Sequence, residues 1–474
     1  MRNINKIISS LLLLLFVTAC TDDFEEINTD PNQPTAVPAE NLFTQAQFAL
    51  ADRMWGRAMN FEFGMLMVQH FSQNEYAEDS RYNQQPSSFN ASWQSFYAGG
   101  LIDLEEAKTI TENNEGLSDA VRNNRLAQIA IMRVWALQIV TDVWGDVPYS
   151  QAFNPEEFPN PAYDGQESIY NGLVAELDAA IGQINTAEAG FGSGDIIYGG
   201  DMALWGKFAN SIKLKLGMRM SNANSGAAAT IVSEALNSSL GVISSNDESA
   251  EFTFDADQRI ANPFFVDAIT RDDFCVSEIL VSSLENNNDP RLAEYAKPNQ
   301  FGDIVGLPYG LTDAASFQLK SISSRPADDI REATAPAKLM TYAEVEFFRA
   351  EAAARSIAGS GAAAAYNNAV EASMMDWGLS SSDAASYLAA NPYNGMSSIA
   401  YEKWVALYTQ GLEAWAESRR LGFDDSFLPI PEAAVISDIP VRALYPTVEA
   451  EANTENLEAV GFNNMTTNMW WDAN

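Results

Sequence analysis

Side chains suited to catalysis are scarce in this chain, which has one histidine, His70. One imidazole cannot form a metal site built from several histidines, and no G-x-S-x-G sequence places a serine on a nucleophile elbow. The patterns G-x-G-x-x-G and G-x-x-x-x-G-K-[ST] are also absent. His70 ends an apolar helical stretch, which favours a structural role. The sequence therefore predicts no cofactor and favours a binding protein over an enzyme.

Carboxylates are abundant, and three pairs of them are adjacent: Asp272–Asp273, Asp328–Asp329 and Asp424–Asp425. Neighbouring side chains on a strand or helix point apart, so such doublets do not supply the acid and base of a glycoside hydrolase. A hydrolase is therefore only the less favoured alternative. A structural calcium ion is compatible with the many Asp and Asn residues, but no EF-hand spacing supports one.

The charge balance narrows the class of partner. The chain has 27 basic and 64 acidic residues, and its formal net charge is −37. Such a surface repels the phosphates of nucleic acids and anionic lipid headgroups. The composition therefore excludes nucleic acid as a favoured partner and leaves neutral ligands, cations and basic protein surfaces.

The N-terminus has the pattern of an export signal. After a positively charged start, the apolar run Ile7–Ala19 has 13 residues, whereas a membrane span needs roughly 20. Small residues then lead into Cys20, which resembles the bacterial lipoprotein signal. Residues 1–19 are therefore predicted to be removed, Cys20 to be lipidated, and residues 20–40 to form an acidic tether. Cys275 then has no partner and is predicted to be a small buried filler.

The rest of the chain, residues 41–474, is predicted to be one mainly α-helical body. Apolar residues recur at helical spacing in nine stretches. These stretches are Leu42–His70, Trp93–Thr111, Leu126–Trp144, Gln166–Ile184, Ala203–Met220, Ala227–Leu240, Lys338–Ile357, Ala362–Trp377 and Ser398–Leu421. Short turns between them indicate antiparallel helical hairpins, although no regular repeat period is found.

Two segments near residues 71–92 and 241–331 lack the helical pattern and are predicted to be irregular insertions, with a short strand at Glu251–Phe254. Both are rich in aromatic and amide residues. Long irregular segments often bind ligands, and sugar rings stack on aromatic side chains. The predicted ligand-binding residues are Tyr76, Tyr82, Asn83, Tyr295 and Tyr309. The tryptophans on apolar helical stripes are predicted to be core residues: Trp55, Trp93, Trp135 and Trp205.

Several motifs occur in a fixed order along the chain. They are Asn28–Asn32, Thr141–Ala152 (TDVWGDVPYSQA), Trp205–Ser211, Glu402–Trp404, Gly411–Arg420, Ile439–Arg442 and Trp470–Asp472. Together they resemble the SusD/RagB family of outer-membrane nutrient-binding lipoproteins, in its SusD-like branch. The motif residues themselves are predicted to be framework: Gly145 ends a helix, and Arg442 pairs with an acid.

The resemblance implies tetratricopeptide-like helical hairpins packed against loops, and no catalytic activity. It also implies a partner, a SusC-like TonB-dependent transporter, to which the family member presents oligosaccharide at the cell outer membrane. The acidic residues after Cys20 resemble the surface-export signal of Bacteroidetes lipoproteins. The predicted ligand is therefore a neutral glycan, and a non-sugar nutrient such as a peptide is the alternative.

Overall fold

The computed structural model describes residues 37–473. The predicted signal peptide, Cys20 and most of the predicted tether lie outside the described residues. From Ala39 onward the chain forms one compact unit. Helices dominate it and strands are short, which confirms the mainly α prediction.

The N-terminal helices contain two π-helical segments. Helix α3 (Ala39–Trp55) is followed by η1 (Arg57–Gly64) and α4 (Met65–Met67), and α5 (Asn90–Ser95) continues through η4 (Phe96–Leu101) into α6 (Ile102–Glu112). The sequence predicted one continuous helix in each place. Glycines at or beside both π segments, such as Gly64 and Gly100, tolerate the altered backbone.

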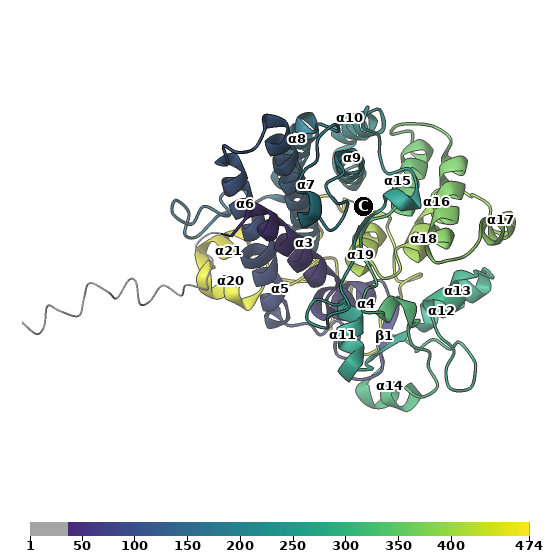
Figure 1. The fold of residues 1–474 in the computed structure, drawn as a ribbon. Helices are drawn as coiled ribbons and strands as arrows, with labels where there is room; N and C mark the ends of the chain where they lie inside the picture. The colour runs from purple at the N-terminus through teal and green to yellow at the C-terminus, as the bar shows by residue number, and fades with distance from the viewer. Residues whose placement is uncertain (1–36, 474) are drawn as a thin grey trace, which may run out of the picture. The chain divides into compact units, whose positions relative to one another are not determined.

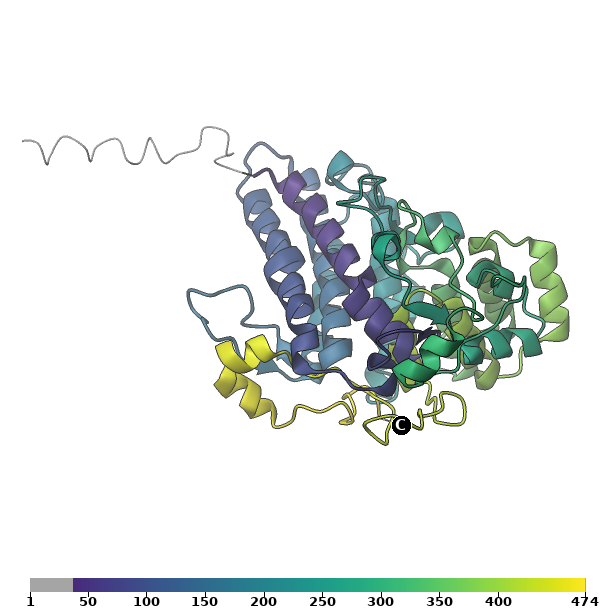
Figure 2. The same ribbon diagram turned by 90° about the horizontal axis from the view of Figure 1, so that it is seen from below.

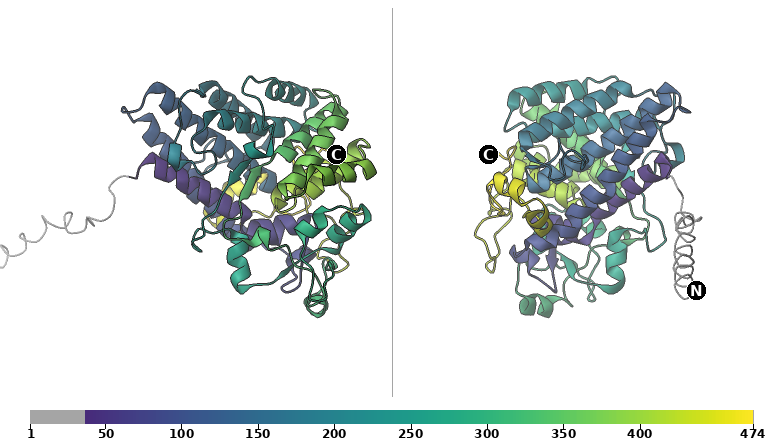
Figure 3. Two further views of the ribbon diagram at one scale, coloured as in Figure 1. Left: turned by 45° about the vertical axis from the view of Figure 1, so that its right-hand side comes forward. Right: turned by 90° about the vertical axis from the view of Figure 1, so that its left-hand side faces the viewer.

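Antiparallel hairpins follow, as the helical pattern predicted. Helices α7 (Asp119–Trp144) and α8 (Gln166–Gln183) pack together, as do α9 (Met202–Arg219) with α10 (Ser225–Leu236), and α15 (Tyr342–Ala354) with α16 (Ala362–Asp376). Figure 1 shows α6–α8 on one side of the unit and α15–α18 on the other, and Figure 3 shows the same arrangement from two further sides. The hairpins therefore form the frame on which the irregular segments lie.

Helix α7 is the central helix of this frame. It ends at Gly145, whose φ of 89° favours glycine, as the motif predicted. Among the described residues, α7 is also the one helix long and apolar enough to cross a membrane. However, 83% of its apolar window is buried inside the unit, which is typical of a core helix. The four tryptophans predicted to be core residues are likewise at most 4% exposed.

Three two-stranded antiparallel sheets connect distant segments. Strand β1 (Phe71–Gln73) pairs with β5 (Phe274–Val276), β2 (Val147–Pro148) with β3 (Tyr163–Asp164), and β4 (Ala250–Phe252) with β6 (Ala337–Met340). Strand β4 overlaps the predicted strand. The β1–β5 pair brings the two predicted insertions side by side.

The second predicted insertion is more helical than the sequence indicated. It contains α11 (Pro263–Thr270), α12 (Glu278–Asn286), α13 (Arg291–Tyr295) and α14 (Asp313–Leu319). These helices are too short for a clear apolar period, and local caps begin two of them: the side chains of Asn262 and Ser277 accept hydrogen bonds from backbone N–H groups. Helix α17 (Ser381–Ala390) was also missed. The 3₁₀ turns are η2 (Asp79–Arg81), η3 (Pro86–Phe89), η5 (Gly192–Gly194), η6 (Asn246–Glu248) and η7 (Asp329–Arg331).

The predicted helix Ser398–Leu421 is in fact two helices, α18 (Met396–Ala406) and α19 (Gly411–Arg420). Thr409 between them has a φ of 74°. The Asn60 side chain fixes this turn, because it donates to Thr409 O (2.9 Å) and accepts from Gly411 N (2.9 Å). A Cβ added at Gly64 would lie 2.4 Å from the Gly411 backbone. Close contact of two glycines therefore holds η1 against α19.

The C-terminal segment returns to the N-terminal helices. Helices α20 (Thr447–Ala452) and α21 (Thr454–Val460), yellow in Figure 2, lie near the ends of the first hairpins. The Glu449 carboxylate accepts hydrogen bonds from Trp93 Nε1 (3.0 Å) and the Tyr163 hydroxyl (2.7 Å). The unit is thus closed by contacts between its two ends.

A buried ion network joins α9, α15, α18 and α19. Eight of its members lie on these four helices: Lys215, Arg219, Glu344, Glu351, Lys403, Glu413, Glu417 and Arg420. Asp142 and Arg355 extend it, through ion pairs with Arg219 and Glu351. Glu417 lies at the centre, 2.6 Å from both Lys403 and Arg420. Burial alone would raise the pKa of Glu417, but the surrounding cations outweigh it and lower the pKa well below its usual value. Five cations match five carboxylates, so the ion pairs of the network are balanced in number.

Candidate functional site

Of the five predicted ligand-binding residues, Tyr76 is the one with a clearly exposed ring, at 62% exposure. Its φ of 53° lies in the left-handed region, which is uncommon for residues other than glycine. The next residue is anchored, because Ala77 N donates to Asp313 Oδ1 at 2.6 Å. The turn therefore holds an aromatic ring in solvent.

The ring lies at a surface hollow of about 580 Å³, which we call the Tyr76 hollow. Its lining comes from the turn after β1, from α11 with the residues that follow it, and from the end of α14. The lining residues are Glu75, Tyr76, Ala268, Ile269, Thr270, Arg271, Asp272, Asp273 and Lys320. In Figure 1 the labels β1, α11 and α14 lie together at the lower end of the unit.

Charged groups in the Tyr76 hollow are paired and partly exposed. The Arg271 guanidinium lies 5.7 Å from the Tyr76 ring centre, and Lys320 pairs with Glu75 at 2.8 Å. Asp272 pairs with Arg325 at 2.7 Å. Burial would raise the pKa of Asp272, but the hydrogen bonds and charge of Arg325 lower it. The hollow thus offers one aromatic ring, the exposed aliphatic side chains of Ala268 and Ile269, and paired polar groups.

Such a surface suits a neutral polyhydroxyl ligand. Each sugar hydroxyl both donates and accepts hydrogen bonds, so it can use the carboxylates and the cations together. A ring face provides the apolar contact. No group of three or more His, Cys, Asp and Glu residues that could hold a metal ion exists in residues 37–473.

The other predicted residues lie deeper. Tyr82 is 1% exposed and its ring centre is 6.5 Å from that of Tyr309, whose hydroxyl is buried. Tyr295 is fully buried at the end of α13: its hydroxyl donates to Val405 O at 3.0 Å, and its ring stacks on Tyr408. Asn83 is half-buried and accepts from Gln85. A ligand role for these four residues stays a prediction, and the Tyr82 and Tyr295 rings are covered by protein.

Arg271, Lys320 and Ile269 were not predicted as site residues. They are about 200 residues or more from Tyr76 in sequence, and nothing in their local pattern marks them. The β1–β5 pairing brings them together. Only a prediction of the β1–β5 pairing could have indicated that these residues lie beside Tyr76.

The motif residues are structural, with one correction. Arg419 donates to the backbone oxygens of Val441 (2.5 Å) and Asp142 (2.9 Å). Arg442 was predicted to pair with an acid, but it donates to Trp144 O and to the Tyr445 hydroxyl. Within residues 37–473 it forms no ion pair. The Arg442 guanidinium can donate to backbone carbonyls at the end of α7 as well as to a carboxylate, so the prediction of an acidic partner was wrong.

The remaining reactive residues also belong to the core. His70 is fully buried against Trp404 and Tyr408, and burial lowers its pKa to about 3. Cys275 is buried, as predicted, and its Sγ accepts from Asn74 and Arg325. Neither side chain reaches solvent, so neither is placed for chemistry on a ligand.

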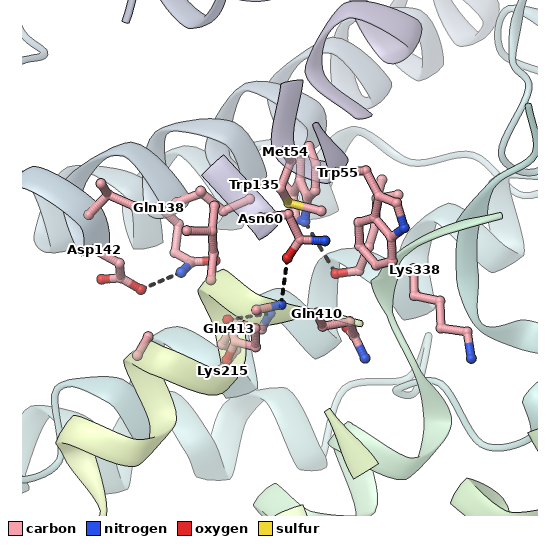
Figure 4. A pocket seen from close by; sticks show the side chains of 16 residues that line it. Met54, Trp55, Asn60, Trp135, Gln138, Asp142, Lys215, Lys338, Gln410 and Glu413 are labelled. Carbon is pink, nitrogen blue, oxygen red and sulfur yellow. Dashed lines mark hydrogen bonds and ion pairs between the residues drawn. The ribbon is translucent and has the colours of Figure 1, made fainter. Parts of the chain in front are cut away.

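Further spaces lie elsewhere in the unit, and the largest of these, of about 610 Å³, is lined by residues that include Glu105, Arg133 and Tyr149. A small cavity of about 20 Å³ is lined by residues including Gln138, Asp142, Lys215 and Glu413, which lie close together in Figure 4. Its volume holds no more than about one water molecule. A larger hollow of about 350 Å³, the Trp377 hollow, is lined by Trp55, Glu251, Asn262, Glu294, Asp329, Ile330, Ala335, Pro336, Lys338, Asp376, Trp377, Gly378 and Thr409.

Comparison with known proteins identifies the family. A family model described as "Starch-binding associating with outer membrane" matches residues 31–446. The chain belongs to the SusD-like family. No curated protein matches the chain.

Solved SusD-like structures share the fold along nearly the whole chain. A chitin-binding protein is 27% identical, with a TM-score of 0.82 over 92% of this chain and 100% of that one. A SusD homologue from Bacteroides uniformis is 26% identical, with a TM-score of 0.76 over 91% and 99%. A chitin-binding SusD homologue from Flavobacterium johnsoniae is 22% identical, with a TM-score of 0.77 over 92% and 99%, and shows the fold alone.

Proposed function

We propose that this SusD-like protein binds a neutral oligosaccharide in the Tyr76 hollow without cleaving it. The observation that carries the proposal is an exposed tyrosine held beside Arg271, Lys320 and paired carboxylates. Membership of a family described by starch binding supports a glycan as the ligand, and so does the chitin-binding relative. A peptide nutrient is the second candidate, since paired charges also accept backbone amides.

The proposed setting is the outer surface of the cell. Residues 1–19 would be removed, and lipid on Cys20 would hold the protein at the outer membrane. The acidic segment after Cys20 would form the tether, and the unit that begins at Ala39 would form the binding body. The bound glycan would be passed to a SusC-like TonB-dependent transporter. The family description, which names association with the outer membrane, supports this setting.

Tyr76→Ala tests the binding site directly. In calorimetric titration of neutral oligosaccharides, the substitution should weaken binding about tenfold, or about 1.4 kcal/mol. Tyr76→Trp should retain binding, because the indole supplies a larger ring face. The melting temperature should stay unchanged, because the ring contributes little to the core.

Phe301→Ala is the matched control, because Phe301 is 68% exposed but lies outside the hollow. It should bind as the parent protein does. Equal affinity of Tyr76→Ala and Phe301→Ala would refute the site. Chromatography of the recovered ligand tests whether the protein cleaves it. Hydrolysis that is lost on substitution of one carboxylate would refute the proposal of binding without cleavage.

A further inference from the structure

Exposed aromatic rings are concentrated in one part of the molecule. Among residues 37–473, three aromatic side chains are exposed: those of Tyr76, Phe301 and Phe317, the last at 61%. All three lie in the two segments that the β1–β5 pair brings side by side, although aromatic residues occur throughout the chain. Single exposed apolar side chains are common on protein surfaces, whereas several in one place indicate a contact surface. The Tyr76 hollow accounts for the first of these rings only.

The turn that carries Tyr76 is attached to α14 on both sides of the tyrosine. On one side, Ala77 N donates to Asp313 Oδ1 at 2.6 Å. On the other side, Glu75 pairs with Lys320 at 2.8 Å. The two residues next to Tyr76 in sequence are therefore held by the first residue of α14 and by the residue that follows its end. The labels β1 and α14 accordingly lie near each other in Figure 1.

Phe317 lies between these two attachment points. Asp313, Phe317 and Lys320 are at positions i, i+4 and i+7, which share one face of a helix, and Lys320 keeps helical backbone angles. Each attachment point is within about 6 Å of Phe317 along the helix axis. The preceding residue, Ser316, is buried, and its hydroxyl donates to Asn74 O at 3.3 Å. The exposed Phe317 ring therefore lies at the edge of the contact between α14 and the turn.

The groups between the two rings suit sugar hydroxyls. Lys320 and Glu75 are paired, and both side chains are partly exposed. Exposed pairs are worth little, so each member can instead hydrogen-bond to a hydroxyl. Phe317 does not line the Tyr76 hollow, and a ligand that fills only the hollow does not touch its ring. A longer ligand that also covers the Lys320–Glu75 pair reaches both rings.

We propose that Phe317 is a second stacking ring for the bound oligosaccharide, so that the site selects chains longer than a disaccharide. The sugar in the hollow stacks on Tyr76, the chain continues across the Lys320–Glu75 pair, and a further sugar places its apolar face on Phe317. This inference rests on the proposed function, because it specifies the length of the ligand that the same site takes.

The test compares a disaccharide with a hexasaccharide in calorimetric titration of the mature protein, using maltose with maltohexaose and, separately, N-acetylated chitobiose with chitohexaose. Phe317→Ala should weaken hexasaccharide binding about fivefold to tenfold and change disaccharide binding less than about twofold. A long chain can also occupy the hollow in several registers, but that advantage is the same in the parent and in the variant. Phe317→Tyr should bind the hexasaccharide as the parent does, because the phenol keeps the ring face.

Phe301→Ala is again the matched control. Phe301 is similarly exposed, but its loop is bonded beyond the end of α14, where Asn299 Nδ2 donates to Ile322 O at 2.6 Å. This variant should bind both ligands as the parent does. The melting temperature of Phe317→Ala should be unchanged, because the ring is exposed.

Unchanged hexasaccharide affinity in Phe317→Ala, or an equal loss for the disaccharide and the hexasaccharide, would overturn the inference. Tyr76→Ala should weaken both ligands, and a Tyr76→Ala protein that binds both as the parent does would refute the proposed site instead. Binding of neither series by the parent protein would refute the proposed function and this inference together.

Discussion

The buried ion network and the Tyr76 hollow contain the same charged residue types in different structural settings. Both contain Arg, Lys, Asp and Glu in pairs. The eight network side chains on α9, α15, α18 and α19 are at most 11% exposed, whereas Lys320, Arg271 and Asp272 in the hollow are 24–48% exposed. Buried pairs are costly to break, while exposed pairs exchange with solvent and ligand at little cost. Exposure, more than residue type, distinguishes the framework from the binding surface.

Neutralising the centre of the network should have the largest effect. Glu417→Gln leaves Lys403, Arg420 and Arg219 short of a carboxylate in a buried site. The free energy of unfolding should fall by about 3–5 kcal/mol. Urea denaturation measures this, with Asp257→Asn as the control because Asp257 pairs with Arg259 on the surface. A Glu417→Gln protein as stable as the control would contradict the structural role of the network.

The next effect concerns pH. The folded-state pKa of His70 is lowered to about 3 from an unfolded value of 6.5. Below pH 6.5 the unfolded chain therefore binds a proton on His70 that the folded chain does not bind. His70 therefore lowers stability as pH falls from 6.5 towards 3, by roughly 1.4 kcal/mol per pH unit. Compared with the parent, His70→Phe should gain about 2–3 kcal/mol between pH 6.5 and pH 4.5.

The comparison of parent and His70→Phe in urea at several pH values isolates this residue, because other groups titrate in both proteins. Buried Asp142 and Glu344 have raised pKa values and act in the opposite direction, with stability lost as pH rises through those values. A constant difference between the two proteins across this range would show that His70 is not held neutral.

Removing a cation from the Tyr76 hollow should affect binding and not stability. Arg271→Ala loses one hydrogen-bond donor to the ligand, which should weaken oligosaccharide binding about threefold to tenfold. The melting temperature should be unchanged, since Arg271 is half-exposed. Calorimetry and thermal melts together test this, and a large fall in melting temperature would place Arg271 with the framework.

Salt should have the smallest effect at the Tyr76 hollow. A neutral ligand forms no ion pair there, so affinity should change less than about twofold between low and moderate salt. Affinity for the neutral oligomer that collapses with salt would mean that the hollow binds a charged ligand.

The sequence predicted the fold better than the site. Apolar stripes place Trp93, Trp135 and Trp205 in the core because periodicity reports burial directly. The break at Thr409 was missed because a side chain almost 350 residues away, Asn60, stabilises it. Tyr76 and Tyr295 have similar polar neighbours in sequence. However, the Tyr295 ring is buried where α13 contacts α18, whereas the turn after β1 exposes the Tyr76 ring. Such differences depend on tertiary contacts.

The contact between Gly64 and Gly411 also affects how the chain must fold. The π-helical segment near the N-terminus cannot complete its packing until α19 has been synthesised, because the two are more than 300 residues apart. Loop closure over such a separation is slow, and partly made chains keep apolar surface exposed. The contact between η1 and α19 can therefore form only late in synthesis, after the local hairpins such as α7–α8 and α9–α10 are available to pack.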